Sequence, residues 1–303
     1  MGQLPYSPQQ WQISATGGSV NQVVLSNCID GMKSLEDEVI DLCVTSPPYD
    51  DLRSYNDSSA WNFDTFKSVA EQLHRVMKVG GVVVWVVGDA TVKGGETGSS
   101  FRQCLHFMDL GFILHDTMIY EKNGSPFPAR RDGNRYSQVF EYMFVLSKKT
   151  KPKTANLLCD KPNRWAGYTH FGKGTIRQKD GTLVERNIKP IPEFSPRNNI
   201  WKYNTGKNYS SKDAAAFEHP AIFPEALAKD HILTWSNEDD LVLDPFMGAG
   251  TTAVCCIETN RKYVGYEIDE TYFDVCNRRI AQHTTVNESH QKETANPILE
   301  AMK

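Results

Sequence analysis

Short apolar runs alternate with segments of helical periodicity along most of this chain, and this alternation strongly constrains its fold. Val39–Val44 is rich in β-branched residues and Val82–Val87 is almost wholly apolar, as expected for strands buried inside a parallel sheet. Between them, apolar residues repeat at helical spacing from Phe63 to Met77, and Gly80-Gly81 is expected to end that helix. The sequence therefore predicts an α/β fold, with a mostly parallel sheet and helices on both faces.

The remaining elements continue the same pattern. We expect further strands at residues 22–25, 112–120, 139–146, 241–243 and 263–266, and helices at 31–36, 99–110, 224–235, 251–259 and 270–280. The strands at 112–120 and 139–146 are expected to form an antiparallel pair at an edge of the sheet.

The segment from residue 148 to residue 212 differs in character. It is rich in Lys, Arg, Asn, Gly, Pro and isolated aromatic residues and has no clear periodicity. Because it is too long for a simple loop, it indicates an inserted, irregular recognition region. The expected organisation is a main domain formed by residues 20–147 and 213–283, this insertion at 148–212, and a polar, frayed tail at 284–303.

The net charge of −4 conceals a strong asymmetry. The block from Lys122 to Lys212 carries 19 Lys and Arg but only 6 Asp and Glu, whereas the rest of the chain carries 14 and 31. A basic block inside an acidic chain suggests that a polyanion docks there, and a solvated basic surface without a partner is an equal alternative.

Cysteine usage and hydropathy indicate a cytoplasmic protein. The seven cysteines are scattered without metal-ligand spacing, as is typical of reduced thiols, and we expect no metal site. His219 also lacks the partners of a metal site or a catalytic triad, so we expect it to be structural. No apolar run approaches the roughly 20 residues that a membrane-spanning helix requires, so no membrane association is expected.

One chemical motif follows the expected strand at 241–243. The strand ends at Asp244, and a turn containing Gly248 and Gly250 opens the next helix, so that a ligand can approach backbone amides closely. Glu267 ends the following strand, where an acid suits a bidentate bond to ribose hydroxyls. A dinucleotide and S-adenosylmethionine both fit this outline. Asp244 favours S-adenosylmethionine, because a carboxylate repels a pyrophosphate and attracts the cationic amino-acid end.

A second motif, Ser46-Pro47-Pro48-Tyr49, follows the expected strand at 39–44. The exocyclic amino group of a nucleobase is a poor nucleophile, because its lone pair is delocalised into the ring. Acceptors that hold both amino protons would favour a tetrahedral nitrogen, and the Ser46 hydroxyl and the Pro47 carbonyl offer two. The proline pair restricts the backbone and fixes these acceptors. Tyr49 offers a ring on which an extruded base can stack.

These segments carry a family resemblance. Thr45–Tyr49, Asp244–Thr252 and Tyr263–Asp269 closely resemble the motifs of DNA amino-methyltransferases that act on N4 of cytosine or N6 of adenine. The catalytic motif precedes the cofactor motif, which is similar to the circularly permuted β group. The resemblance spans residues 22–280. It implies a Rossmann-like S-adenosylmethionine-dependent methyltransferase fold, with S-adenosylhomocysteine as the product.

The resemblance also implies site residues. The catalytic loop matches Ser46, Pro47, Pro48 and Tyr49. The matching cofactor-binding residues are Asp244, Pro245, Phe246, Gly248, Gly250, Thr251, Glu267, Phe223 and Pro224. Asn27 stands where relatives often carry an acid that contacts the cofactor adenine. Asp89, at the end of the strand 82–87, either positions substrate or caps a loop.

The implied substrate is double-stranded DNA, from which the target base is flipped. Candidates for phosphate or guanine contacts are Arg130, Arg131, Arg135 and Lys173. Relatives with Ser before Pro-Pro-Tyr lean towards N4 of cytosine and those with Asp towards N6 of adenine, so the resemblance favours cytosine. Enzymes that methylate C5 of cytosine present a nucleophilic cysteine as Pro-Cys, a dipeptide that this chain lacks. A companion restriction endonuclease and a homodimer are possible partners. The alternatives are a methyltransferase of RNA or protein glutamine, and a non-catalytic nucleic-acid-binding module.

Overall fold

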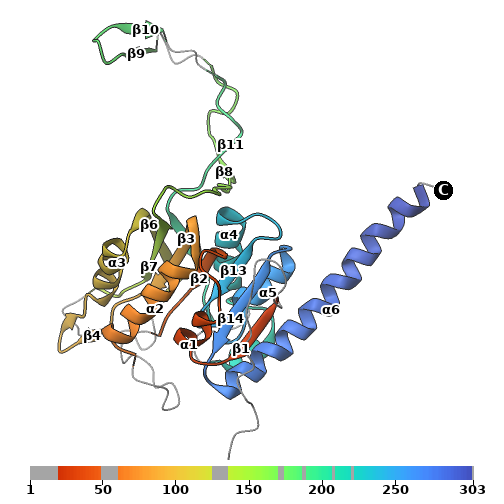
Figure 1. The fold of residues 1–303 in the computed structure, drawn as a ribbon. Helices are drawn as coiled ribbons and strands as arrows, with labels where there is room; N and C mark the ends of the chain where they lie inside the picture. The colour runs from red at the N-terminus through yellow and green to blue at the C-terminus, as the bar shows by residue number, and fades with distance from the viewer. Residues whose placement is uncertain are drawn as a thin grey trace, which may run out of the picture. The chain divides into compact units, whose positions relative to one another are not determined.

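Strands from both ends of the sequence hydrogen-bond into one eight-stranded sheet in this computed structural model of the protein (Figure 1). The strands lie in the order β1-β14-β13-β2-β3-β7-β6-β12. Their bounds are β1 (Gln22–Leu25), β2 (Ile40–Thr45), β3 (Met77–Val87), β6 (Phe112–Lys122), β7 (Phe140–Lys148), β12 (Ile200–Tyr203), β13 (Leu241–Asp244) and β14 (Lys262–Glu267). Within this sheet β7 pairs antiparallel with both β3 and β6, and the other pairings are parallel.

The structure describes residues 20–48, 61–124, 136–169, 174–185, 189–206, 209–219 and 222–301, with side chains up to residue 287. The chain divides into two compact units. One is formed by Met1–Asn156 together with Asn199–Lys303, and the other by Leu157–Asn198. The sheet belongs to the first unit.

Helices cover both faces of the sheet (Figure 1). Neighbouring contacts link α1, α2 and α3 into one group and α4, α5 and α6 into another. Their bounds are α1 (Cys28–Lys33), α2 (Phe63–Val76), α3 (Ser99–Asp109), α4 (Glu225–Trp235), α5 (Thr251–Glu258) and α6 (Glu270–Ala301), with a 3-10 helix η1 (Ala214–Glu218) before α4. The predicted α/β fold with a mostly parallel sheet is therefore confirmed.

Burial explains why these elements form. In β2 the residues Leu42, Cys43 and Val44 are all fully buried, because the strand has a neighbour on each side and helices over each face. Helix α2 begins at Asn62, whose side chain accepts hydrogen bonds from the amides of Asp64 and Thr65. Its buried residues recur at helical spacing and meet the sheet: Phe66, Val69, Ala70, Leu73 and Val76.

Several details differ from the sequence-based expectations. Helix α1 covers Cys28–Lys33 and not 31–36, because Asn27 caps it three residues earlier than expected. Gly80-Gly81 lies inside β3 and does not end α2, because Met77 already pairs with Ile40 of β2. Strands β6 and β7 are antiparallel as predicted, but β12 lies outside β6 and forms the sheet edge. Helix α6 continues from the expected end at residue 280 to Ala301, through polar residues that include no glycine.

The unit Leu157–Asn198 holds two short antiparallel strand pairs. They are β8 (Lys161–Pro162) with β11 (Phe194–Ser195), and β9 (Thr175–Arg177) with β10 (Leu183–Glu185). Arg197 pairs with Asp160, which joins residues near the two ends of this unit's chain segment. The predicted recognition region at 148–212 contains this whole unit and also β12, which belongs to the main sheet.

A small hairpin, β4 (Thr91–Val92) with β5 (Gly95–Glu96), connects β3 to α3. Within the part of the chain that the structure describes, no helix combines the length and the apolar character that crossing a membrane requires.

Candidate active site

The carboxyl ends of four neighbouring parallel strands bring the two sequence motifs together. Thr45 ends β2, Asp244 ends β13 and Glu267 ends β14, and these strands lie side by side with β1 beyond them. Ser46, Pro47 and Pro48 follow Thr45 directly, with Pro47 buried and the other two half-buried. The two motifs therefore meet at the carboxyl ends of these strands, where ligands of open α/β sheets bind.

Asp244 joins the motifs through hydrogen bonds. Its Oδ1 accepts from the Thr45 hydroxyl at 2.6 Å and from the Phe246 amide at 3.0 Å, and its Oδ2 accepts from the Thr252 hydroxyl at 2.6 Å. Burial raises the pKa of Asp244, although these hydrogen bonds act to lower it. The carboxylate is thus held in one orientation by three donors.

The turn after Asp244 depends on two glycines. Gly248 and Gly250 have φ angles of 51° and 80°, in the left-handed region that side chains rarely adopt. A Cβ on Gly250 would lie 2.6 Å from the sulfur of Cys276, and one on Gly248 would lie 3.2 Å from Nε2 of His219. Thr251 then begins α5 and is buried. The turn is therefore packed tightly from beneath by α6 and by the segment before α4.

Glu267 anchors the same turn from the neighbouring strand. Its Oε2 accepts from the Gly248 amide at 2.8 Å, and its Oε1 accepts from the amides of Ile268 and Asp269 at 2.9 Å. Burial raises the pKa of Glu267, and these three backbone donors oppose that rise. Two buried carboxylates, Asp244 and Glu267, thus border the turn, an arrangement that suits a cationic ligand.

The second-tier cofactor candidates lie around these strand ends. Asn27 follows β1, and its side chain caps α1 by accepting from the Ile29 amide at 2.9 Å. It lies beside Glu267, because the neighbouring Ser26 amide donates to the Glu267 carbonyl. Pro224 is buried at the start of α4, and Phe223 before it is half-buried. The roles of these residues toward a cofactor stay predictions.

Phe246 projects toward aromatic residues. Its ring centroid lies 5.2 Å from Trp61 and 6.2 Å from Trp85, both in edge-on geometry. Trp85 is fully buried and donates its indole hydrogen to Gln103 at 2.8 Å. A pocket of ≈ 220 Å³ lies beside Trp61, lined by Trp61, Asn62, Phe63, Thr97, Ser99, Arg102 and Gln103.

Asp89 caps a helix. Its carboxylate accepts from the Ser100 amide at 2.9 Å, and from the hydroxyls of Ser99 at 3.1 Å and Ser100 at 2.6 Å. These contacts fix the first turn of α3 to the end of β3. The sequence left Asp89 to cap a loop or to position substrate; the observed contacts cap a helix, and the positioning role stays a prediction.

Several predicted residues lie outside the described part of the chain: Tyr49, Arg130, Arg131, Arg135 and Lys173. Their roles stay predictions. Among the residues that are described, no group of three His, Cys, Asp or Glu side chains has the spacing of a metal site. The absence of a metal from the chemistry likewise stays a prediction.

Sequence reasoning assigned no role to three residues that the structure places at the site. Thr45 and Thr252 bind Asp244 from opposite sides, and Arg279 of α6 donates to the carbonyl of Ala249 in the glycine turn. The sequence signal that could have identified Thr45 and Thr252 is their position as hydroxyl residues flanking the two motifs. No local signal distinguishes Arg279 from its neighbour Arg278.

The sequence of this chain matches a known protein family and several of its members. The family model N6_N4_Mtase, described as DNA methylase, matches residues 40–278. The chain is 55% identical over 252 residues to the orphan methyltransferase M.BamHII of Bacillus amyloliquefaciens, covering 83% of this chain and 92% of that protein. It is 25% identical over 269 residues to the type II methyltransferase M.BglII of Bacillus subtilis, covering 84% and 68%.

Solved structures show the same fold. The PvuII DNA methyltransferase (cytosine-N4-specific) has a TM-score of 0.61 at 19% identity, over 89% of this chain and 92% of that one. TTHA0409, a putative DNA modification methylase of Thermus thermophilus complexed with S-adenosyl-L-methionine, has a TM-score of 0.57 at 20% identity, over 87% and 94%. The region that the family model matches, residues 40–278, contains both motifs and the strands β2, β13 and β14 that carry them.

Proposed function

Because the chain belongs to the N6/N4 DNA methylase family, and is therefore an S-adenosylmethionine-dependent DNA amino-methyltransferase, we propose that it methylates N4 of cytosine. N6 of adenine is the second candidate. The observation that carries the proposal is the Thr45–Asp244 hydrogen bond. It holds Ser46 next to the turn at residues 245–250, which contains Gly248 and Gly250 and is called the cofactor turn below. The neutral hydroxyl of Ser46 favours cytosine, and the PvuII enzyme of similar fold is described as cytosine-N4-specific.

The proposed cofactor site lies around the turn after β13. Two buried carboxylates complement the positive charge of S-adenosylmethionine, with Asp244 toward its amino-acid end and Glu267 toward its ribose. The glycines allow the ligand to approach the backbone. The full set of proposed contacts is Asn27, Phe223, Pro224, Asp244, Pro245, Phe246, Gly248, Gly250, Thr251 and Glu267.

Catalysis in this proposal depends on holding the amino group of the flipped base. S-adenosylmethionine, when bound, supplies an electrophilic methyl group on a sulfonium. Ser46 Oγ and the Pro47 carbonyl accept the two amino hydrogens and draw them out of the ring plane, so that the nitrogen becomes tetrahedral and its lone pair is no longer delocalised into the ring. The nitrogen would then take the methyl group, with S-adenosylhomocysteine as the leaving group and one amino proton released to solvent. Pro47 and Pro48 restrict the loop and keep both acceptors in place. Tyr49 is proposed to stack on the base.

DNA binding is assigned to the basic middle of the chain. The compact unit Leu157–Asn198 supports a role for region 148–212 in target recognition, since it presents short strand pairs and cation–aromatic contacts such as Arg164 over Trp165 at 5.4 Å. Arg130, Arg131, Arg135 and Lys173 are proposed contacts to phosphate or guanine. The domain formed by 20–147 and 213–283 would then carry the chemistry, with residues 284–303 as a tail.

The family match indicates the substrate class of this chain but not its protein partners. The family match supports DNA as the substrate over RNA or a protein glutamine, and supports catalysis over binding alone. M.BamHII is described as an orphan methyltransferase and M.BglII as a type II methyltransferase. A companion endonuclease and a homodimer stay predictions for this chain.

The test is incubation of the purified protein with double-stranded DNA and labelled S-adenosylmethionine, followed by mass spectrometry of the nucleosides. We expect N4-methylcytosine. Detection of N6-methyladenine alone would show that the target base is adenine and not cytosine. Ser46→Ala should abolish methylation and retain cofactor binding. Ser68→Ala on α2 is the matched control and should retain both. Full activity of Ser46→Ala would remove Ser46 from the mechanism.

A further inference from the structure

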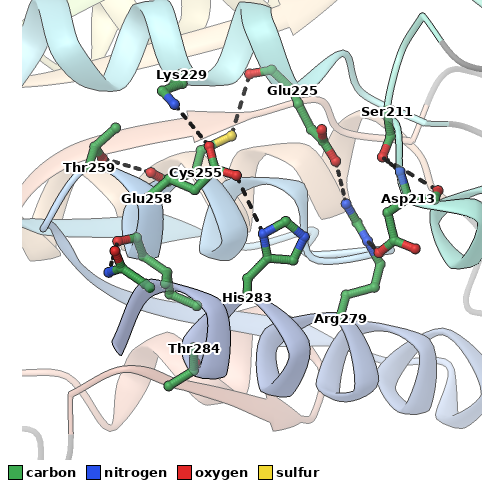
Figure 2. A network of polar contacts seen from close by, with 12 residues as sticks. Ser211, Asp213, Glu225, Lys229, Cys255, Glu258, Thr259, Arg279, His283 and Thr284 are labelled. Atoms are coloured by element: carbon green, nitrogen blue, oxygen red, sulfur yellow. Dashed lines mark hydrogen bonds and ion pairs between the residues drawn. The ribbon is translucent and has the colours of Figure 1, made fainter. Parts of the chain in front are cut away.

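Arg279 of α6 is completely buried, yet it carries a charge that the proposed chemistry does not use. Its guanidinium donates from Nε to Asp213 at 2.8 Å, from Nη2 to Glu225 at 2.5 Å, and from Nη1 to the carbonyl of Ala249. Figure 2 shows the two carboxylates converging on this side chain from above α6. All three directions of the guanidinium fork therefore have an acceptor.

Each acceptor belongs to a different segment beside the cofactor turn. Ala249 lies between Gly248 and Gly250 in the turn itself. Glu225 is the first residue of α4, directly after Phe223 and Pro224. The side chain of Arg279 thus connects the turn to a segment that contains two of the proposed cofactor contacts.

The third acceptor reaches the underside of the turn. Asp213 caps η1 by accepting from the Ala215 amide at 2.9 Å, and His219 directly follows the end of η1 at Glu218. The His219 ring packs against Tyr272 of α6, with 4.3 Å between centroids, and lies close beneath Gly248. Arg279 therefore also fixes the element that supports Gly248 from below.

The turn transmits this restraint to a proposed ligand-binding group. Gly248 donates its amide to Glu267, the acid proposed to bind the ribose. The Ala249 carbonyl, which Arg279 holds, belongs to the peptide plane between Ala249 and Gly250, two planes after the one that carries the Gly248 amide in the same turn. Arg279, Ala249, Gly248 and Glu267 thus form one continuous series of bonds from α6 to the cofactor site.

A purely stabilising role does not require a charge here. Buried ion networks are weak contributors to stability, and well-packed apolar residues often replace them without loss. Such residues would not hold the Ala249 carbonyl, because only a donor can do so. The ionic arrangement is therefore better suited to orientation than to stability alone.

Resting on the proposed function, we propose that Arg279 is a positioning residue for the cofactor: through Ala249 it sets the geometry of the glycine turn and of Glu267. It touches neither the cofactor nor the base. Loss of Arg279 weakens the binding of S-adenosylmethionine. The rate of the chemical step at saturating cofactor and the affinity for DNA stay close to those of the unaltered protein.

The test compares Arg279→Lys with Arg278→Gln on the full chain. Arg278 is the matched control, because it is adjacent on α6 and ion-paired to Glu218 at 2.6 Å, but its side chain is 58% exposed. Calorimetric titration with S-adenosylmethionine should give a Kd raised about tenfold or more for Arg279→Lys, the loss expected for a hydrogen bond of a charged donor. Its kcat at saturating cofactor and its KM for DNA should change by less than about twofold, and Arg278→Gln should match the unaltered protein in all three.

Two further variants keep the proposal open to refutation. Glu225→Gln retains an acceptor without charge, should fold even where Arg279→Lys does not, and should raise the Kd by about threefold. Arg279→Met with Asp213→Asn and Glu225→Leu replaces the ion network by uncharged side chains, and Asp213→Asn keeps the acceptor that caps η1. This triple variant should recover stability relative to Arg279→Lys and still bind S-adenosylmethionine weakly.

The outcomes separate this proposal from the proposed function. An unaltered Kd in folded Arg279→Lys, or in Glu225→Gln where Arg279→Lys does not fold, would overturn the positioning role and leave the cofactor assignment standing. Full recovery of affinity together with stability in the triple variant would also overturn it, because packing would then suffice. Failure of the unaltered protein to bind S-adenosylmethionine would instead overturn the cofactor assignment.

Discussion

The hydroxyl of Thr45 donates a 2.6 Å hydrogen bond to the carboxylate of Asp244, although 199 positions separate the two residues. Thr45 ends β2 and Asp244 ends β13, and the two strands are parallel neighbours. This bond therefore joins the strand that leads to the catalytic loop with the strand that leads to the cofactor turn. Its consequences can be measured for both stability and binding.

Replacing Thr45 by Val removes the hydroxyl and keeps the shape of the side chain. Asp244 is buried and would lose one of its three donors, so we expect the free energy of unfolding to fall by about 1–3 kcal/mol. Urea unfolding measures the change. Thr45→Ser is the control, because it keeps the hydroxyl and loses one methyl group, worth about 0.8 kcal/mol. Equal stability of the Val variant and the unaltered protein would show that this hydrogen bond contributes little.

Asp244→Asn is expected to separate stability from binding. Burial raises the pKa of Asp244 above its unfolded value of 3.8, so ionisation is harder in the folded state, and stability is lost as pH rises through that window. At pH 7 the neutral Asn variant should therefore unfold no more easily than the unaltered protein. Thr252 lies 3.4 Å from the Val44 carbonyl and can donate there while accepting from the new amide. The affinity for S-adenosylmethionine should fall about tenfold, because the cationic end loses its carboxylate.

Asp41→Asn gives the opposite pattern and serves as its control. Asp41 lies near the start of β2, away from the cofactor turn, where it accepts from Lys78 at 2.7 Å and from the Leu241 amide at 3.1 Å. This variant should lose stability, by up to about 1 kcal/mol for a partly exposed pair, and retain cofactor affinity. Calorimetric titration and urea unfolding on both variants test the pair. Loss of stability in Asp244→Asn with unaltered affinity would contradict the assignment of Asp244.

The strands and helices around the site were predictable because each has its own local signal. The apolar run Val82–Val87 and the helical repeat of α2 depend on neighbours in sequence, and both were predicted. Strand β12 was missed because it has only four residues in a polar segment, of which Ile200 is exposed and Trp201 buried. Its pairing with β6 depends on residues about eighty positions away and leaves no repeat to recognise.

The candidate site shows the same division. Asp244 and Glu267 were predicted from their places at strand ends, where parallel strands converge. Arg279 was not, because Arg278 and Arg279 are identical neighbours on one polar helix. Only the tertiary packing of α6 against η1 and α4 decides that one is fully buried and the other is at the surface.

Gly250→Ala should strain the cofactor turn in two separable ways. The left-handed φ of 80° is unfavourable for Ala by about 1–2 kcal/mol, and the new Cβ would lie 2.6 Å from the Cys276 sulfur. Cys276→Ala alone removes the sulfur and costs a modest amount of packing. The double variant Gly250→Ala with Cys276→Ala should therefore recover the part of the loss due to the clash and keep the part due to φ. A double-mutant cycle by urea unfolding measures this coupling, and strict additivity would exclude the clash.

His231 is expected to make the protein less stable as the pH is lowered. It is fully buried and its ring packs against Trp201, with 4.7 Å between the centroids. Its Nδ1 accepts from the Trp235 indole at 3.2 Å, and desolvation lowers its pKa from 6.5 to about 3. The folded state thus keeps His231 neutral, while the unfolded chain takes up a proton below pH 6.5, so stability is lost as pH falls from 6.5 toward 3.

Between pH 7 and pH 5 this one residue should lower the free energy of unfolding by about 2 kcal/mol, since each unit below the unfolded pKa contributes about 1.4 kcal/mol. His231→Phe keeps the aromatic packing and has no proton to bind, so this share of the pH dependence should disappear. The variant should be less stable at pH 7 by about 1 kcal/mol, because the Trp235 indole loses its acceptor. Urea unfolding of both proteins at the two pH values gives the difference, and parallel pH profiles would show that His231 is not held neutral.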